Sequence, residues 1–162
     1  MAEKQRTDIL IENNTAVWDM RMEGAIHGTY AGRFRFRCYL SPTQQIAANR
    51  DFRELIGKDM YMADEHEKSL AYCLTQLKYR ILESPPFWLS SAQASGVAGD
   101  IADENVLVAI LGAAIDSEMI YRNQLQERKV AAIKRAKEAA EKILKVKDEV
   151  EADDDTSEEA GN

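Results

Sequence analysis

The chain has 162 residues, of which 45% are hydrophobic and 30% are charged, and its formal net charge is −7. This length allows one domain with a real core and is short for two. No run of about 18 apolar residues is present, so we expect no transmembrane helix. The N-terminus has no apolar stretch long enough for a signal peptide, and the sequence therefore predicts a cytosolic protein.

The charge is spread unevenly along the chain. Residues 128–147 contain eight Lys and Arg against two Glu, whereas residues 148–162 contain eight acidic residues and no basic one. We therefore predict four segments: a flexible N-terminus over 1–15, a globular domain over 16–126, a charged helical extension over 127–150, and a disordered acidic tail over 151–162. The acidic tail could fold back on the basic segment and mask it.

The stretch from Gly32 to Gly57 carries the strongest local signals. Residues 33–40 alternate strictly, with Phe34, Phe36 and Cys38 on the side that we expect to be buried. Ser41, Pro42 and Gln44 then form a capping box with proline at the first helical position, and Gly57 ends the pattern. The sequence predicts a strand over 33–40 followed directly by a helix over 42–56.

Glycines at 24, 28 and 32 punctuate the region before this strand. They indicate turns between short strands, which we place at roughly 16–22, 25–30 and 33–40. An isolated hairpin is marginally stable, so we expect this meander to pack on the helix over 42–56.

A second helix is predicted from about Asp64 to Glu83, where Ser84-Pro85-Pro86 stops it. Residues 90–99 are rich in Ser and Gly and predict a long flexible loop. A last, very long helix is predicted after Asp103 or Asp100, either of which could cap it. The predicted fold class is α+β and mostly helical, with a short antiparallel N-terminal meander packed on about three helices.

The sequence gives little support for catalysis or for a cofactor. It contains no GxSxG, Walker, HExxH or CxxC motif. His66 lies among acidic residues at consecutive positions, which point in different directions on a helix and cannot converge on one metal ion. Cys38 and Cys73 lie on apolar faces and are predicted to be buried thiols. We therefore expect no catalytic, cofactor-binding or metal-binding residues.

Three groups of residues are candidates for protein binding. Arg33, Arg35 and Arg37 form a basic ridge that would suit an acidic partner or phosphate, although a solubilising outer face is the favoured interpretation. Phe87 and Trp88 follow a rigid turn; we favour the interpretation that they fill the core, and contact with a partner is the alternative. The third group is a weak coiled-coil pattern after residue 127, in which the candidate contacts are Ile133, Ala140 and Ile143.

The order of these segments resembles the tail assembly chaperones of long-tailed bacteriophages. The residues that carry the resemblance lie between about 16 and 126: Gly28-Thr29-Tyr30-Ala31-Gly32-Arg33-Phe34-Arg35-Phe36, Leu40-Ser41-Pro42-Thr43, Arg53-Glu54-Leu55-Ile56-Gly57, Ala71, Arg80, Pro86-Phe87-Trp88 and Asp103-Glu104-Asn105-Val106-Leu107. The long charged helix after 126 departs from the compact pattern of that family.

The resemblance implies a function in virion morphogenesis. Members of the family bind the tape measure protein in the host cell cytoplasm during tail assembly, and they are absent from the finished particle. It implies as partners the tape measure protein and the tail tube protein, with self-association as a further possibility and no membrane. The alternatives are a structural virion component, such as a neck or head-completion protein, and a small DNA-associated regulator. Binding to nucleic acid is disfavoured because the body is acidic.

Overall fold

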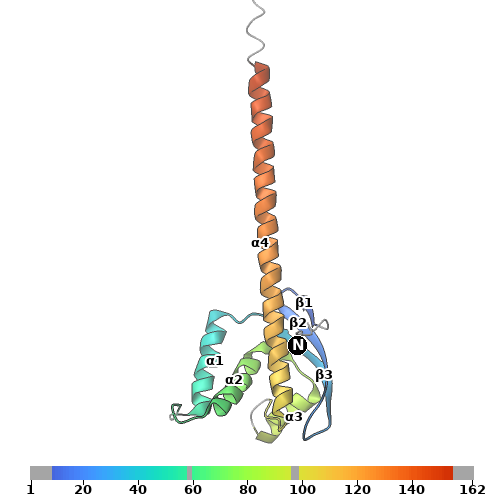
Figure 1. Cartoon of the computed structure of the whole chain (residues 1–162), viewed down its shortest axis with the longest axis vertical. Coiled ribbons are helices and arrows are strands. Elements are labelled where there is room, and N and C mark those ends of the chain that lie inside the picture. Colours follow the sequence, from blue (N-terminus) through green and yellow to red (C-terminus); the bar gives the residue numbers. More distant parts are fainter. Residues whose placement is uncertain (1–8, 58–59, 96–98, 155–162) are drawn as a thin grey trace, which may run out of the picture. The chain divides into compact units, whose positions relative to one another are not determined.

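The computed structural model describes residues 9–57, 60–95 and 99–154, and of residues 92–95 and 148–154 the backbone alone. The protein is α+β and mostly helical, as predicted (Figure 1). The elements in chain order are β1 (Ile9–Glu12), β2 (Thr15–Glu23), β3 (Thr29–Arg37), α1 (Pro42–Ile56), α2 (Glu65–Arg80), β4 (Ile81–Glu83), α3 (Pro86–Ser95) and α4 (Glu104–Asp154).

The chain divides into two compact units, Met1–Tyr121 and Arg122–Asn162. The division falls a few residues before the predicted domain end at residue 126. Helix α4 runs through both units, so its first part belongs to the first unit and the rest makes up the described part of the second.

The first unit is built on a four-stranded antiparallel sheet of order β1-β2-β3-β4. In the central hairpin Trp18 pairs with Phe34 and Ala16 with Phe36, so the large apolar side chains of both strands share one face. β3 is one continuous strand where the sequence predicted two short ones, at 25–30 and 33–40, because Gly32 pairs with Met20 and does not end the ladder.

The buried face of the sheet is covered by helices (Figure 1). The rings of Phe34 and Phe36 lie 5.6 Å apart, and the ring of Trp88 from α3 meets Phe34 edge-on at 5.8 Å. The core is completed by Leu77 of α2 and by the first turns of α4, which contribute Val106, Leu107, Ile110, Leu111, Ala113 and Ala114. Alternation in the strands and the helical period in α4 together produce this core.

Helix α1 begins and ends where the sequence predicts. Ser41 Oγ accepts from the Gln44 amide at 3.4 Å, and Gln44 Oε1 accepts from the Ser41 amide at 2.9 Å, so the capping box is complete. The expected packing of this helix on the hairpin is wrong. α1 packs on α2 instead, with the Phe52 and Tyr72 rings edge-on at 6.5 Å, and only Ala48 of α1 is buried.

Helix α2 starts at the predicted position but ends earlier. Asp64 caps it in a second capping box with Glu67. The helix stops at Arg80, and Ile81–Glu83 then form β4, which pairs with the outer edge of β3. The sequence did not indicate this strand, because a segment of three residues is too short to show the alternation of apolar and polar positions that marks a strand.

Three predicted irregular segments are partly regular. Ile9–Glu12 form β1 within the segment predicted as flexible, and residues 1–8 lie outside the described chain. α3 extends to Ser95 through the predicted loop over 90–99, of which residues 96–98 are not described. α4 continues to Asp154 into the predicted acidic tail, so the proposed fold-back of 155–162 lies outside the described residues.

Gly32 lies where β3 passes closest to the segment before α3. A Cβ built on Gly32 would collide with the ring of Pro85, and its φ of 156° is one that residues with a side chain rarely adopt. We therefore expect Gly32→Ala to lower the free energy of unfolding by about 1–3 kcal/mol through overpacking. Urea denaturation measures this, with the exposed neighbour Ala31→Ser as control; equal stability of the two variants would contradict the expectation.

Candidate protein-binding surfaces

Among the described residues of the first unit, Asp103 is the most buried charged residue, with 1% of its surface exposed. It accepts hydrogen bonds from the amides of Ile26 at 2.7 Å and His27 at 3.0 Å, and from the hydroxyl of Tyr30 at 2.8 Å. The sequence predicted Asp103 as a helix cap. Its backbone carbonyl does accept from Val106, but its side chain binds the β2–β3 turn instead.

These hydrogen bonds set the protonation of Asp103 and Tyr30. Burial opposes ionisation of Asp103, but the donors at Ile26, Tyr30 and His27 outweigh it and hold the pKa of the carboxyl below its usual value. Burial and the hydrogen bond to Asp103 raise the pKa of Tyr30 to about 12. The pair therefore consists of a carboxylate and a neutral phenol at neutral pH, an arrangement that joins the turn to the start of α4.

Neither histidine lies in a cluster of reactive groups. The side chain of His27 is exposed, and only its backbone amide contacts Asp103. His66 is also exposed, and its Nε2 lies 3.2 Å from a carboxylate oxygen of Glu104. Within the described ranges, no three His, Cys, Asp or Glu side chains are placed to hold a metal ion.

Both cysteines are buried free thiols, as predicted. Burial raises the pKa of Cys38 to about 11 and also raises that of Cys73. Neither side chain is therefore a reactive thiolate at neutral pH.

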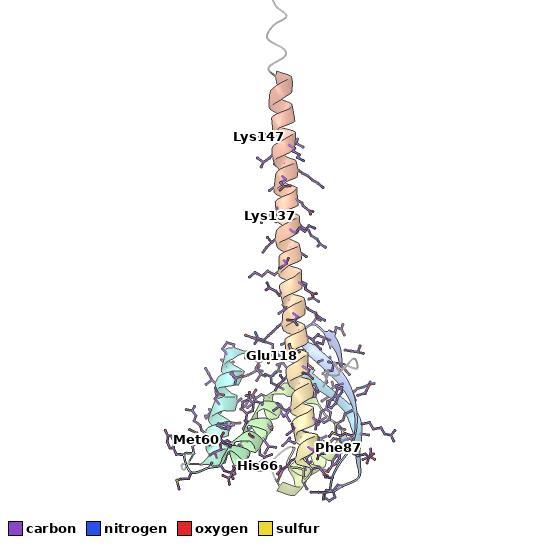
Figure 2. All side chains as sticks on the ribbon, viewed as in Figure 1. Met60, His66, Phe87, Glu118, Lys137 and Lys147 are labelled. Carbon is purple, nitrogen blue, oxygen red and sulfur yellow. The ribbon has the colours of Figure 1, made fainter. Side chains whose placement is uncertain are left out.

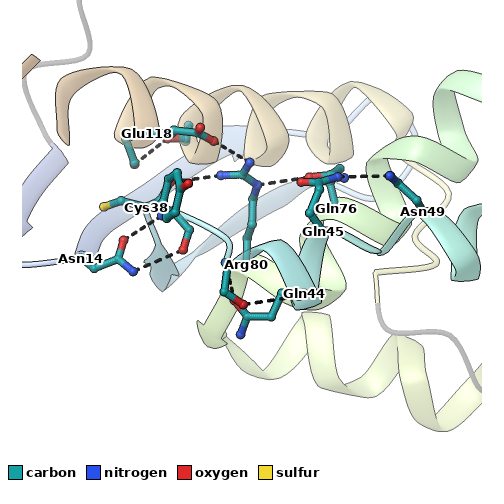
Figure 3. Close-up of polar contacts among 12 residues, drawn as sticks. Asn14, Cys38, Gln44, Gln45, Asn49, Gln76, Arg80 and Glu118 are labelled. Atoms are coloured by element: carbon teal, nitrogen blue, oxygen red, sulfur yellow. Dashed lines mark hydrogen bonds and ion pairs between the residues drawn. The ribbon is translucent and has the colours of Figure 1, made fainter. Parts of the chain in front are cut away.

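A buried ion pair joins α2 to the first part of α4 (Figure 3). Arg80 donates to Glu118 at 2.6 Å and to the backbone oxygen of Cys38 at 3.2 Å, and its Nε donates to Gln76 at 3.4 Å. The Arg80 side chain is 8% exposed and that of Glu118 is 21% exposed. Since the hydrogen-bonding groups of Arg80 are satisfied within the fold, we assign this cluster a structural role.

The three arginines of the predicted basic ridge have partners within the chain. Arg33 forms a bidentate ion pair with Asp19, in which Nε and Nη2 donate to the two carboxylate oxygens at 2.8 and 3.0 Å. Arg35 Nη1 donates to Glu83 Oε1 at 2.9 Å. Arg37 donates to the backbone oxygen of Tyr79 at 3.2 Å. The hydrogen bond from Arg33 also lowers the pKa of Asp19, so this face carries paired charges and does not present a ridge of positive charge.

Phe87 and Trp88 belong to the core, which is the interpretation that the sequence favoured. Trp88 is 3% exposed, and Phe87 meets the rings of Tyr30 at 5.0 Å and Phe34 at 6.0 Å. The structure therefore contradicts the use of Trp88 as an exposed partner contact. Phe87 is half-buried against the same cluster.

The second unit presents the third predicted group on its surface. Ile133 is 49% exposed and Ile143 is 70% exposed, and Ala140 is exposed as well. From Leu125 to Lys147 every residue of α4 is exposed, and Figure 2 shows the side chains of this part, Lys137 and Lys147 among them, standing out around the helix.

Six apolar residues of this part of α4 lie on one side of the helix, whereas Val146 lies on the opposite side. At about 100° of rotation per residue, the other five side chains of this group lie within about 80° of Ile133 around the helix axis. We call these residues the C-terminal apolar face: Val130, Ile133, Ala136, Ala140, Ile143 and Leu144. Arg135 and Lys142 lie on the opposite side. The predicted list omitted Val130, Ala136 and Leu144, which a search for a broad amphipathic face, in place of a heptad seam, would have found.

Comparisons of the chain with protein-family models, with curated proteins and with solved structures give no match. Among the described helices, none combines the length and the apolar character that a membrane span requires.

The Asp103 cluster makes stability depend on pH in a definite direction. Because the pKa of this carboxyl is lower in the folded than in the unfolded chain, the folded state binds fewer protons. Its stabilising effect is present above the usual pKa of 3.8 and is lost as the pH falls below that value. We expect Asp103→Asn to be less stable at neutral pH and to lose less stability on acidification. Urea midpoints across pH measure this, with Tyr30→Phe as an intermediate case; parallel profiles for wild type and Asp103→Asn would contradict it.

Removing only one partner of the Arg80–Glu118 pair should destabilise the fold more than removing both. We expect Arg80→Met to lower the free energy of unfolding by about 3–5 kcal/mol, because it removes the guanidinium group that neutralises the part-buried carboxylate of Glu118. The double variant Arg80→Met/Glu118→Leu should recover most of the loss, and the exposed Arg33→Met should change stability little. Chemical denaturation measures all three, and equal losses in the single and double variants would contradict the structural role.

Proposed function

We propose that this protein is a binding protein for helices that acts as an assembly chaperone, and specifically that it is a tail assembly chaperone of a long-tailed bacteriophage. The observation that carries the proposal is the C-terminal apolar face. It lies on a helix whose residues 125–147 are all exposed, and it places aliphatic side chains side by side in water. Contiguous exposed apolar surface of this kind is typical of sites of interaction.

The composition of this part of α4 favours a helix that persists before it binds. Ala, Lys, Glu, Leu and Arg are strong helix formers and dominate residues 125–147. Lys134 and Glu138 also lie 3.9 Å apart at the i,i+4 spacing. A preformed amphipathic helix binds a second helix through side chains at i, i+3, i+4 and i+7.

The size of the face favours a reversible interaction. Val130, Ile133, Ile143 and Leu144 are each about half or more exposed, so covering them contributes roughly 1–2 kcal/mol apiece. The total of about 4–8 kcal/mol is close to the lower part of the range of about 4–15 kcal/mol that association costs. Binding through this face alone is therefore weak, which suits a chaperone that must release its client.

The identity of the client comes from the resemblance of residues 16–126. A tape measure protein is a long helix with apolar stripes, which aggregates unless it is covered, and a chaperone for it needs accessible apolar surface and solubilising charge. The alternative is a structural virion component, in which the same face of α4 would dock permanently. A DNA-associated regulator has less support, because Arg33 and Arg35 are paired with Asp19 and Glu83.

Co-expression with a tape measure protein encoded in the same genome tests the proposal. We expect the two chains to co-purify and the soluble fraction of the tape measure protein to rise, because its apolar stripe is covered. We expect Ile133→Asp to abolish both effects, since it places a charge in the centre of the face. Ala131→Asp introduces the same side chain on the opposite side of the helix and should leave both effects intact.

Mass spectrometry of purified particles separates the alternatives. A chaperone is absent from finished particles, whereas a structural component is present at fixed stoichiometry. A genome without a tape measure protein, or a tape measure protein that does not bind the wild-type chain, would contradict the proposal.

A further inference from the structure

The positive charges of α4 are placed beside the C-terminal apolar face as well as opposite to it. Lys129 and Lys137 come four residues before and four residues after Ile133, so both lie on the same side of the helix as Ile133. Lys147 has the same relation to Ile143. The face is therefore a band of aliphatic side chains that is accompanied by ammonium groups along its length.

From this pattern we infer that the C-terminal apolar face binds an amphipathic helix of another protein that carries Asp and Glu beside its own apolar stripe. The inference deepens the proposed function and rests on it for the statement that the client is helical. Residues 128–147 carry a charge of +6, so a helix with acidic flanks would meet mainly opposite charges, with Glu141 at the edge of the face as the exception. Such complementarity speeds association and fixes the register of the two helices.

A second copy of this chain fits the face poorly. In a parallel pair each lysine would meet its own equivalent, and an antiparallel pair centred within residues 128–147 would also place basic residues opposite basic residues. Like charges in these positions destabilise a pair of helices. An antiparallel pair centred near Lys147 would place residues 148–162 opposite the basic segment, but those residues carry few aliphatic side chains and would leave the apolar face uncovered. The pattern therefore favours a different chain that is both acidic and apolar.

Nucleic acid is also a poorer fit. Phosphate contacts require lysine and arginine but no aliphatic band, which would stay exposed in such a complex.

Two synthetic helical peptides with the same leucine stripe test the inference on the full chain. One carries Glu at the positions beside the stripe and the other carries Lys there. Fluorescence anisotropy at about 0.15 M salt should give a dissociation constant at least tenfold lower for the Glu peptide, and the difference should shrink as salt is added.

Two charge reversals locate the effect. Lys137→Glu changes the charge beside the apolar face, whereas Lys142→Glu makes the same change on the opposite side of the helix. We expect Lys137→Glu to weaken binding of the Glu peptide by about tenfold and to strengthen binding of the Lys peptide, while Lys142→Glu changes both by less than about threefold. The reciprocal gain for the Lys peptide excludes a simple loss of folding.

Several outcomes would overturn the inference. Equal affinity for the two peptides, or equal effects of the two reversals, would show that charge does not select the partner. A dimer in sedimentation equilibrium that Ile133→Asp dissociates would assign the face to a second copy. Duplex DNA that binds and competes with the Glu peptide would assign it to nucleic acid. If a tape measure protein binds with no dependence on Lys137, the inference fails and the proposed function stands. If the Glu peptide binds as expected but the tape measure protein does not bind, the inference stands and the proposed function fails.

Discussion

The carboxylate of Asp103 holds the turn between β2 and β3 to the start of α4. Its hydrogen bonds from Ile26, His27 and Tyr30 span more than 70 positions of sequence, and the carboxylate and the Tyr30 ring are both buried. A buried carboxylate that lost these donors would be strongly unfavourable, so the turn and the helix must form together. The apolar face of the sheet can then close over Val106, Leu107 and Ile110, which begin one turn later.

The charged residues of the first unit mainly stabilise its own fold. Arg80 joins α2 to Glu118 and to the end of β3, and Arg33 and Arg35 each pair with a carboxylate on a neighbouring strand. Over residues 125–147 of α4, by contrast, the basic residues lie along a helix whose apolar side chains are all exposed. The two units therefore place the same residue types differently: charged side chains of the first unit pair within the fold, whereas those of the second are available for the partner that we propose.

Local signals predicted the elements whose ends depend on neighbouring residues. Ser41, Pro42, Gln44 and Gly57 define α1 without help from the rest of the chain, and α1 was predicted to the residue. β4 and the contact of Asp103 with the β2–β3 turn depend on residues far away in sequence, so no local pattern indicates them. α3 was missed because the Ser and Gly content of 90–99 outweighed Pro86, which is suited to a first helical position.

The candidate site could be predicted only in part, because some of its features are local to the sequence and others depend on tertiary contacts. The spacing of Ile133, Ala140 and Ile143 and the charge of residues 128–147 are properties of the sequence, whereas the pairing of Arg33 with Asp19 and the burial of Trp88 follow from tertiary contacts. Because the core of the protein is complete before Arg122, substitutions on the later turns of α4 leave the buried contacts of the first unit unchanged. If this face binds a client as we propose, natural variation can change which client is recognised while the folded body is inherited intact, so that specificity and foldability evolve under separate constraints.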